Sequence, residues 1–286
     1  MKASLLEMLA CPVCQKSLEF EEDILVDRLS KGVFRCSSGH LYQMKDEIPI
    51  LKDPKLSKKE FVWKVEFPDI EKYDKIRKKY ASYLPEEQKE ADRALRDKVV
   101  KIVSKEKLLL DVASGMGTLL LDLSQQCEKG KNLLGVDVDE KPLRGAKLKL
   151  EEQRSYSQVS LFVMDVKHLA LKPQRLSCIT SYFGLDNIPE TKKAIQEVSR
   201  VLMSKGQLIL ATLWFKESSR SLTLAEKLGY GAIATEDRLT RTLEETGFEI
   251  DSAEKFYSGE WSYNPMDRLP LKGDWYAHAL VLAHKK

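Results

Sequence analysis

The stretch that most constrains this chain is Leu108–Gly117, which reads LLLDVASGMG. Residues 108–112 are apolar apart from one acid and predict a buried strand. A turn that carries two glycines follows, and the apolar residues 118–124 predict a helix. A strand that passes through a tight turn into a helix brings the backbone close to a ligand and points free N–H groups at it. Because Asp-x-Ala-x-Gly-x-Gly is only part of a nucleotide fingerprint, the rest of the chain must identify the ligand.

Strands and helices alternate from this stretch to the end of the chain. Further strands are predicted over 132–137, 159–165, 176–182, 207–213, 248–256 and 275–284, and further helices over 142–153, 190–203 and 236–246. This alternation predicts a doubly wound, mostly parallel sheet of seven strands with helices on both faces. Ligands of such sheets bind beyond the carboxyl ends of the strands. Asp111, Asp137 and Asp165 all come at those ends, so we expect them at one site.

Two nucleoside-containing cofactors suit such a crevice, NAD and S-adenosylmethionine. Leu120 stands where the third glycine of Gly-x-Gly-x-x-Gly would be, and a pyrophosphate needs the open turn which the three glycines provide. S-adenosylmethionine has no phosphate and carries a sulfonium cation, which an acidic Asp111 suits better. Asp137 follows Gly117 at about the twenty residues expected for a carboxylate that binds ribose hydroxyls. The residues therefore favour S-adenosylmethionine.

The first 51 residues carry a different signal. Cys11 and Cys14 form a Cys-x-x-Cys pair, and Cys36 and His40 add a thiolate and an imidazole. Two such knuckles joined by a β-hairpin hold Zn²⁺ in structural sites, where protein fills all four ligand positions. A redox Cys-x-x-Cys usually opens a helix in a thioredoxin-like unit, and the surrounding sequence has no such pattern. We therefore predict a structural zinc on a small β domain over residues 1–51.

This N-terminal segment resembles the small zinc-ribbon family that activates or accompanies methyltransferases. The resemblance is carried by LLEMLACPVCQKSLEF and by RCSSGHLYQMKDEIPIL, above all by the Leu-Ala-Cys-Pro opening and by the Asp-x-Ile-Pro-Ile-Leu close at Asp46–Leu51. The segment has more acidic than basic residues, which suits it poorly to binding phosphates unaided.

Residues 108–213 resemble the class I (Rossmann-like) S-adenosylmethionine-dependent methyltransferases. LLLDVASGMG resembles their first motif, with Ala113 in place of the first glycine. GVDVDEKPL resembles their acidic ribose motif, and MDVKHL the segment whose acid meets the adenine amino group. FGLDNIPE and AIQEVSRVLMSKGQLIL resemble the stretch after the fourth strand, with a weaker version of its usual Lys-Pro-Gly-Gly turn. The resemblance implies a methyltransferase domain over 108–286 whose cofactor contacts are Asp111, Ala113, Gly115, Gly117, Asp137, Val138, Asp165, Val166 and Tyr182.

Residues 52–107 join these parts and form the most basic region of the chain. The polar residues 52–59 predict a linker, residues 86–104 predict a helix, and charged and aromatic residues alternate over 60–83. Basic and aromatic side chains together suit a nucleic-acid surface. We favour the alternative, a pair of solvated helices that caps the ligand pocket of the next domain. In related-looking enzymes an aromatic helix here covers the cofactor, which makes Tyr73, Tyr80 and Tyr83 candidate cofactor or substrate contacts.

The sequence does not identify the methyl acceptor. Methyl transfer from a sulfonium often needs only alignment in a shielded pocket, so no catalytic residue need stand out. The stretch after Tyr182 has neither the Asn-Pro-Pro-Tyr type of amine signature nor a Pro-Cys nucleophile. Asp186 and Asn187 either orient a substrate or cap the next helix. If the last strand is antiparallel, loop 258–275 lies on the cofactor side. The residues that would then line a substrate mouth, with flat rings that stack a base or wall an apolar molecule, are Tyr257, Trp261, Tyr263, Asn264 and Trp275.

Three functions are compatible with these features. The first is methylation of a small molecule, since the core motifs resemble the broad family that acts on quinones, sterols and other metabolites. The second is RNA methylation, because the layout is similar to that of bacterial rRNA guanine-N1 methyltransferases, although the acidic ribbon and the longer gap between its knuckles count against RNA. The third is a cofactor-binding regulator without catalysis.

The overall composition adds little to this choice. The net charge of +3 is too small to imply nucleic acid by itself. No apolar run reaches the ~18 residues of a membrane span, and the first ten residues lack the pattern of a signal peptide. We therefore expect a reducing, cytoplasmic setting.

Overall fold

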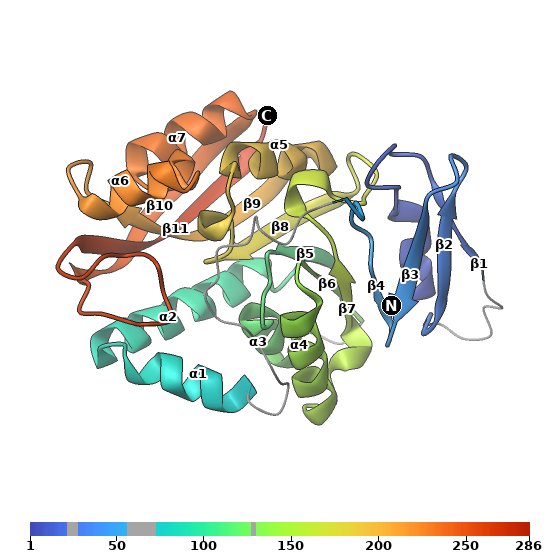
Figure 1. The fold of residues 1–286 in the computed structure, drawn as a ribbon, viewed down its shortest axis with the longest axis horizontal. Helices are drawn as coiled ribbons and strands as arrows, with labels where there is room; N and C mark the ends of the chain where they lie inside the picture. The colour runs from blue at the N-terminus through green and yellow to red at the C-terminus, as the bar shows by residue number, and fades with distance from the viewer. Residues whose placement is uncertain (22–27, 56–72, 127–129) are drawn as a thin grey trace.

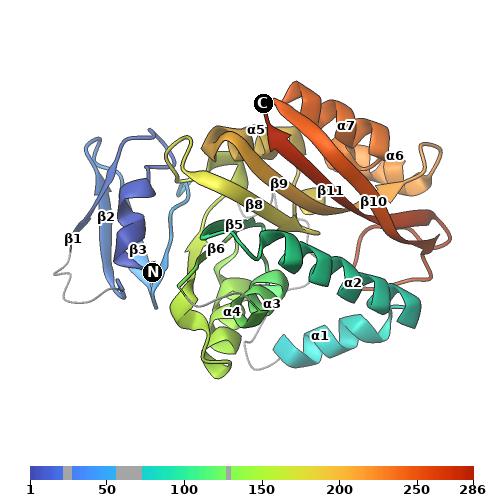
Figure 2. The same ribbon diagram turned by 180° about the vertical axis from the view of Figure 1, so that it is seen from behind.

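The computed structural model of the chain describes residues 1–21, 28–55, 73–126 and 130–286. Figures 1 and 2 show a four-stranded sheet of N-terminal residues beside a seven-stranded sheet that has helices on both faces. No helix within the described ranges is long and apolar enough to cross a membrane.

The small sheet is an antiparallel meander. It follows the 3-10 helix η1 (Ala3–Met8), and its strands are β1 (Leu18–Glu21), β2 (Gly32–Cys36), β3 (Leu41–Lys45) and β4 (Ile48–Pro49). In β3 the buried side chains alternate with exposed ones, which turns Tyr42 and Met44 inward. The sheet therefore has one face against a core, as the predicted β-hairpins require.

Two helices precede the large sheet, α1 (Tyr73–Ser82) and α2 (Glu86–Val103). The prediction of a helix over 86–104 is confirmed by α2. Leu95, Val99 and Val103 recur at four-residue spacing and are all buried, so α2 lays an apolar stripe on the sheet. Most of the alternating segment 60–83 lies outside the described residues.

The large sheet has the order β10-β11-β9-β8-β5-β6-β7. Its strands are β5 (Leu108–Val112), β6 (Asn132–Asp137), β7 (Val159–Val163), β8 (Leu176–Tyr182), β9 (Leu202–Phe215), β10 (Phe248–Glu260) and β11 (Trp275–Lys285). Neighbours from β7 to β9 pair in parallel, and β11 runs antiparallel to β9 and β10. The predicted fold class is confirmed, and the antiparallel last strand meets the condition on which loop 258–275 was expected on the cofactor side. The strand order reverses at β5, which is where such folds bind ligands.

The remaining helices cover both faces of this sheet. The α-helices are α3 (Thr118–Gln126), α4 (Glu140–Glu152), α5 (Thr191–Val201), α6 (Arg220–Lys227) and α7 (Glu236–Glu245). The 3-10 turns are η4 (Tyr156–Gln158), η5 (Val166–His168), η6 (Leu185–Asn187) and η7 (Gly231–Ile233). One buried cluster joins the sheet to α2, α3 and α4, and another joins its opposite face to α5 and α7.

Two details of these elements differ from what the sequence predicts. The helix predicted over 190–203 ends at Val201, and β9 begins directly at Leu202. Residues 203–206 form a bulge, because Leu202 pairs with Leu176 and the ladder resumes only at Gln207. A side chain on Gly206 would lie 2.9 Å from the carbonyl oxygen of Met203, so only glycine fits there. The helix α6 was not predicted at all, although Ser219 caps it by accepting a hydrogen bond from the amide of Leu222.

Candidate functional site

The turn between β5 and α3 has a backbone that glycine favours. The φ angles of Ala113, Gly115 and Gly117 are 53°, 50° and 70°. A Cβ on Gly117 would lie 2.9 Å from the Cβ of Ala146 in α4, so the turn and this helix approach as closely as glycine allows. Ala113 keeps a Cβ in the left-handed region, at a cost of about 1 kcal/mol, and it packs against Gly184. The predicted strand, turn and helix are thus confirmed at the switch point of the sheet.

Asp111 lies inside the sheet just before this turn and is 1% exposed. Its Oδ1 accepts a hydrogen bond of 2.8 Å from the hydroxyl of Thr180 in β8. Burial raises the pKa of Asp111 to about 7, and the nearby charge of Asp137 acts in the same direction. A bound cation would favour the ionised form of this buried carboxyl group, because its positive charge stabilises the carboxylate that burial disfavours.

Asp137 ends β6 and reaches back to the turn. Its Oδ2 accepts a hydrogen bond of 2.8 Å from the amide of Gly115, and its Oδ1 accepts one of 3.0 Å from the amide of Asp139. Burial raises the pKa of Asp137 to about 6. Val138 follows directly, and Asp139 caps α4 by accepting a hydrogen bond from the amide of Lys141. The structure therefore brings the predicted ribose acid to the predicted turn, and its role in binding stays a prediction.

Asp165 has an unused hydrogen-bonding atom. Its Oδ1 accepts a hydrogen bond of 2.9 Å from the amide of Lys167, but its buried Oδ2 has no partner among the described residues. The residue is only 5% exposed, and Val166 beside it is also buried. A buried oxygen without a donor costs free energy unless a ligand supplies one. An exocyclic amino group such as that of adenine is a donor of this kind, so the site fits the cofactor that the sequence predicts.

Tyr182, at the end of β8, is tied to helix α2. Its hydroxyl accepts a hydrogen bond of 3.1 Å from Arg96, which also pairs with Asp122 at 2.9 Å. This links α2, α3 and β8 around the carboxyl end of the sheet. The hydroxyl is engaged by protein, and the predicted cofactor contact of Tyr182 remains a prediction.

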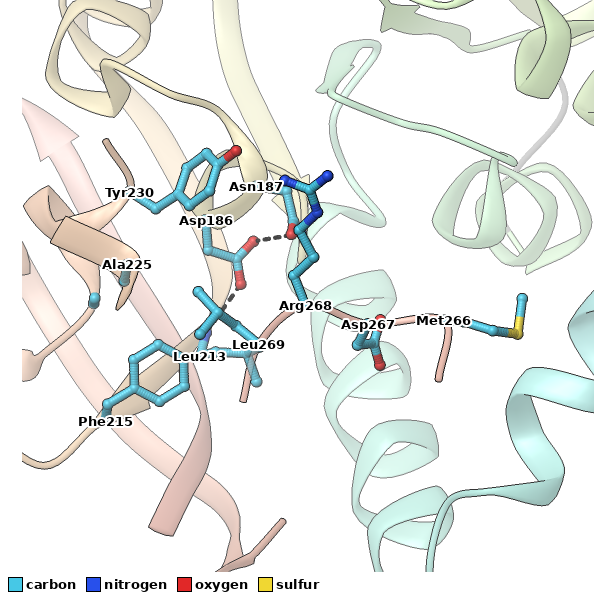
Figure 3. Close-up of a pocket in the computed structure, with 11 residues that line it drawn as sticks. Asp186, Asn187, Leu213, Phe215, Ala225, Tyr230, Met266, Asp267, Arg268 and Leu269 are labelled. Atoms are coloured by element: carbon cyan, nitrogen blue, oxygen red, sulfur yellow. Dashed lines mark hydrogen bonds between the residues drawn. The ribbon is translucent and has the colours of Figure 1, made fainter. Parts of the chain in front are cut away.

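A pocket opens beyond the ends of β8 and β9 (Figure 3). Its polar lining residues are Asp186, Asn187, Tyr230, Asp267 and Arg268, and its apolar lining residues are Leu213, Phe215, Ala225, Ala234, Met266 and Leu269. The pocket has a volume of about 40 Å³, and its lining combines apolar walls with a few polar groups, the combination that is typical of small-molecule sites.

Asp186 is held in this pocket from two sides. Its Oδ2 accepts a hydrogen bond of 3.2 Å from the amide of Leu213, and its Oδ1 accepts one of 3.4 Å from the side chain of Asn187. Burial raises the pKa of Asp186 to about 6. Neither residue caps α5, whose N-cap is Glu190, so the capping alternative for these residues was wrong. The hydroxyl of Tyr230 is buried in the pocket without a partner among the described residues.

The rim of the pocket joins segments that are far apart in sequence. Tyr80 of α1 donates a hydrogen bond to Asp267, and burial raises the pKa of this acid to about 6. Among the residues predicted at the mouth, Trp261 is buried against Tyr276 at 5.1 Å between ring centroids, and Tyr263 is 58% exposed. Neither lines the pocket. Tyr83 is half-buried, and the side chain of Tyr73 lies outside the described part of the chain.

A buried polar network lies behind Leu213. His278 is opposite Leu213 in the β9–β11 ladder, and its Nδ1 is 2.5 Å from the carboxylate of Asp92. Its Nε2 is 3.4 Å from the side-chain amide nitrogen of Gln88, and the Oε1 of Gln88 accepts a hydrogen bond of 2.6 Å from the hydroxyl of Tyr276. The network fixes α2 on β11. The sequence contained no signal for it, because the partners are almost two hundred residues apart.

The four predicted metal ligands converge in the small sheet. The ligand atoms of Cys11, Cys14, Cys36 and His40 all lie within 4.8 Å of one another. The two sulfurs of Cys14 and Cys36 are 3.8 Å apart, which is about the separation of two thiolates on one tetrahedral Zn²⁺. The hydroxyl of Tyr42 lies 3.1 Å from the sulfur of Cys11 and supports the cluster from inside the sheet. The donor set and its geometry fit the ion that the sequence predicts.

Comparisons with known proteins identify the core. Curated relatives include a demethylmenaquinone methyltransferase of Lactobacillus johnsonii, 31% identical over 35% of this chain and 41% of its own. They also include a ubiquinone/menaquinone biosynthesis C-methyltransferase of Rickettsia prowazekii, 29% identical over 39% of this chain and 46% of its own. The chain thus spans about half the length of the curated relatives it matches.

A solved structure shows the same fold at low identity. A crystal structure described as a putative methyltransferase from Bacillus halodurans matches with a TM-score of 0.54 and 17% identity, over 67% of this chain and 98% of that one. The model of the ubiE/COQ5 methyltransferase family matches residues 67–226, which are more than half of the chain. By this match the chain belongs to the ubiE/COQ5 methyltransferase family.

Proposed function

We propose that this chain transfers a methyl group from S-adenosylmethionine to a ring carbon of a small, quinone-type acceptor. One observation carries the proposal: three acids at the switch point, two of them buried, lie beside a turn whose Ala113 packs against Gly184, two residues before Asp186 of the pocket. The names of the two relatives, which refer to menaquinone and ubiquinone, support the class of acceptor. No feature of the described structure favours RNA as the acceptor.

The cofactor would lie along the ends of β5, β6 and β7. Asp137 would accept hydrogen bonds from the ribose hydroxyls, and the free Oδ2 of Asp165 would accept one from the adenine amino group. Asp111 and the turn to Gly117 would face the amino-acid part, where a negative carboxylate favours the positive charge of the ligand. When bound, S-adenosylmethionine supplies an electrophilic methyl group on its sulfonium.

The acceptor pocket offers what methylation of carbon requires. A ring carbon is nucleophilic when the ring is electron-rich, as in a hydroquinone that loses a hydroxyl proton. Asp186, with its pKa near 6, is mostly ionised at neutral pH and can take that proton. The O–H bond then breaks, the electron pair enters the ring, and the ring carbon forms its bond to the methyl group as the S–CH₃ bond breaks. The ring proton leaves afterwards to solvent, which restores the aromatic ring.

Labelled methyl transfer tests this proposal. The purified chain is incubated with methyl-labelled cofactor and, in parallel, with a reduced 1,4-naphthoquinol, its oxidised quinone and total RNA. We expect label in the quinol alone. Asp186→Asn should lower kcat at least about tenfold and leave the affinity for S-adenosylhomocysteine unchanged, because the amide cannot accept a proton. Asp237→Asn, on the surface of α7, is the matched control. Label in RNA and in no quinol would contradict the proposal.

We also propose that Cys11, Cys14, Cys36 and His40 hold a structural Zn²⁺. Their convergence supports this, and four protein ligands leave no open position for chemistry on a bound water. The ion would link Cys11 and Cys14 to Cys36 and His40 and would thereby stabilise the small sheet.

A further inference from the structure

The N-terminal ribbon adds a short strand to the open edge of the large sheet. Ile50 forms a parallel bridge with Val163, the last residue of β7, and the amide of Leu51 donates a hydrogen bond of 2.8 Å to the carbonyl of Val163. Figure 1 shows β4 beside β7 at this edge. An unpaired edge strand is thereby covered from within the same chain. Asp165 follows Val163 by two residues, so this pairing fixes the backbone that leads into the acid.

The ribbon also holds the far side of the same segment. The amide of Ala10 donates to the carbonyl of Ala170 at 3.0 Å, and the amide of Lys172 donates to the carbonyl of Met8 at 2.8 Å. Between these contacts, Leu9 forms a bridge with Leu171. Residues 163–172, which include Asp165, are therefore anchored to the ribbon at both ends.

Lys52 extends this support to the neighbouring loop. Its ammonium group donates a hydrogen bond of 3.0 Å to the carbonyl of Val138, one residue beyond the end of β6. The carbonyl of Asp137 itself accepts a hydrogen bond of 2.9 Å from the amide of Met164. The peptide after Asp137 is therefore held by a charged donor from one side and by the strand-end segment of β7 from the other.

We propose that Lys52 is a positioning residue of the cofactor site and that the ribbon is a structural part of that site. Lys52 fixes the peptide that orients the carboxylate of Asp137, while residues 8–10 and 50–51 fix the segment that carries Asp165. A loop ordered before the ligand arrives binds more tightly, since less freedom is lost on binding. The inference rests on the proposed function, which places the cofactor at Asp137 and Asp165.

The test measures the affinity of the full chain for S-adenosylhomocysteine by calorimetry. Lys52→Met removes the donor and should weaken binding about tenfold, the usual range for a charged hydrogen bond. Lys52→Arg keeps a charged donor and should recover most of the affinity. Lys55→Met, three residues on in an exposed position, should bind like the wild type. In steady-state assays the KM for the cofactor should rise with little change in kcat.

A double-mutant cycle separates positioning from general loss of structure. If Lys52 acts through Asp137, Lys52→Met should cost much less affinity in a chain that already carries Asp137→Asn. The role of Lys52 would be overturned if Lys52→Met weakened binding equally in both backgrounds, or if it did not weaken binding at all. Binding of S-adenosylhomocysteine by the wild type would in that case leave the proposed function standing. If Lys52→Met does not fold, Lys52→Gln takes its place in the same cycle. A wild-type chain that binds no S-adenosylhomocysteine would overturn both proposals.

Discussion

At the scale of single residues, the proposed cofactor site contains acidic side chains whose ionisation is disfavoured by burial. Asp111 and Asp137 lie in one buried region, and burial raises the pKa of the first to about 7 and of the second to about 6. A carboxyl group with a raised pKa in the folded protein binds its proton more tightly there than in the unfolded chain. The contribution of Asp111 to stability therefore declines as the pH rises from 3.8, its ordinary value, to about 7. Such a site gains most from a cationic ligand.

This state predicts how cofactor binding depends on pH. Binding of the cationic S-adenosylmethionine should favour ionised Asp111, so the complex forms with loss of a proton below pH 7. We expect affinity to fall as the pH drops from about 7 to 5.5, by up to about tenfold per unit for one linked proton. Calorimetry at a series of pH values measures this. Asp111→Asn should remove the part of the decrease that lies near pH 7, while the part near pH 6, where Asp137 titrates, should remain. Asp237→Asn should keep the whole profile. An equally steep profile in Asp111→Asn would show that another group titrates.

The acids were predictable from sequence and the pocket was not, for a physical reason. Asp111, Asp137 and Asp165 each end an apolar run, and parallel strands bring their carboxyl ends to one edge whatever the loops do. Tyr230 and Asp267 enter the pocket from a turn and a long loop, where no periodicity reports which side chain faces inward. Trp261 illustrates the difficulty, because its large ring packs into the core beside Tyr276 and not around a ligand.

At the scale of elements, periodicity identified most strands but missed local departures from it. The ranges 108–112, 132–137 and 176–182 match β5, β6 and β8 residue for residue. The bulge at 203–206 was missed because Ser204-Lys205-Gly206 looks like a helix stop, and Lys205 adopts a φ of 62° inside a strand. Helix α6 was missed because it is short, with eight residues, although Ser219 is a typical cap.

The ribbon is the element whose stability should depend on metal. Its sheet is small, with strands of two to five residues, and its buried side chains include Leu18, Phe34 and Tyr42. We expect the purified chain to contain one equivalent of zinc. Cys36→Ser should lose it and lower the melting temperature by about 5 °C or more.

Metal content and melting curves, measured together, check this prediction. Cys178→Ala is the matched control, because Cys178 is buried in β8, away from the cluster, and should keep the zinc. Wild-type protein with less than about half an equivalent of zinc, or a Cys36→Ser variant that melts like the wild type, would contradict it.

At the scale of the whole molecule, the ribbon and the methyltransferase core share one apolar interior. The sequence predicts a ribbon domain over 1–51 and a methyltransferase domain over 108–286, joined by residues 52–107, since the cysteine cluster and the α/β core have distinct patterns. In the structure one buried cluster contains Leu5, Leu9 and Leu51 of the ribbon together with Leu169 and Leu171 of the core. Sequence patterns indicate which side chains are buried within each part. They do not indicate that the apolar face of the ribbon packs against that of the core.

This shared interior predicts that the chain unfolds as one cooperative unit. Leu9 is fully buried at the junction, so Leu9→Ala should leave a cavity and destabilise the protein by about 2–5 kcal/mol. If both parts depend on this contact, scanning calorimetry of the wild type shows a single transition whose calorimetric and van't Hoff enthalpies agree, and Leu9→Ala shifts all of it. Leu148→Ala, at an exposed position of α4, should leave the transition where it is. Two resolved transitions, with only the smaller one shifted by Leu9→Ala, would contradict this prediction. The ribbon would then fold independently, and its contacts with the loops of the proposed cofactor site would not hold the two parts together.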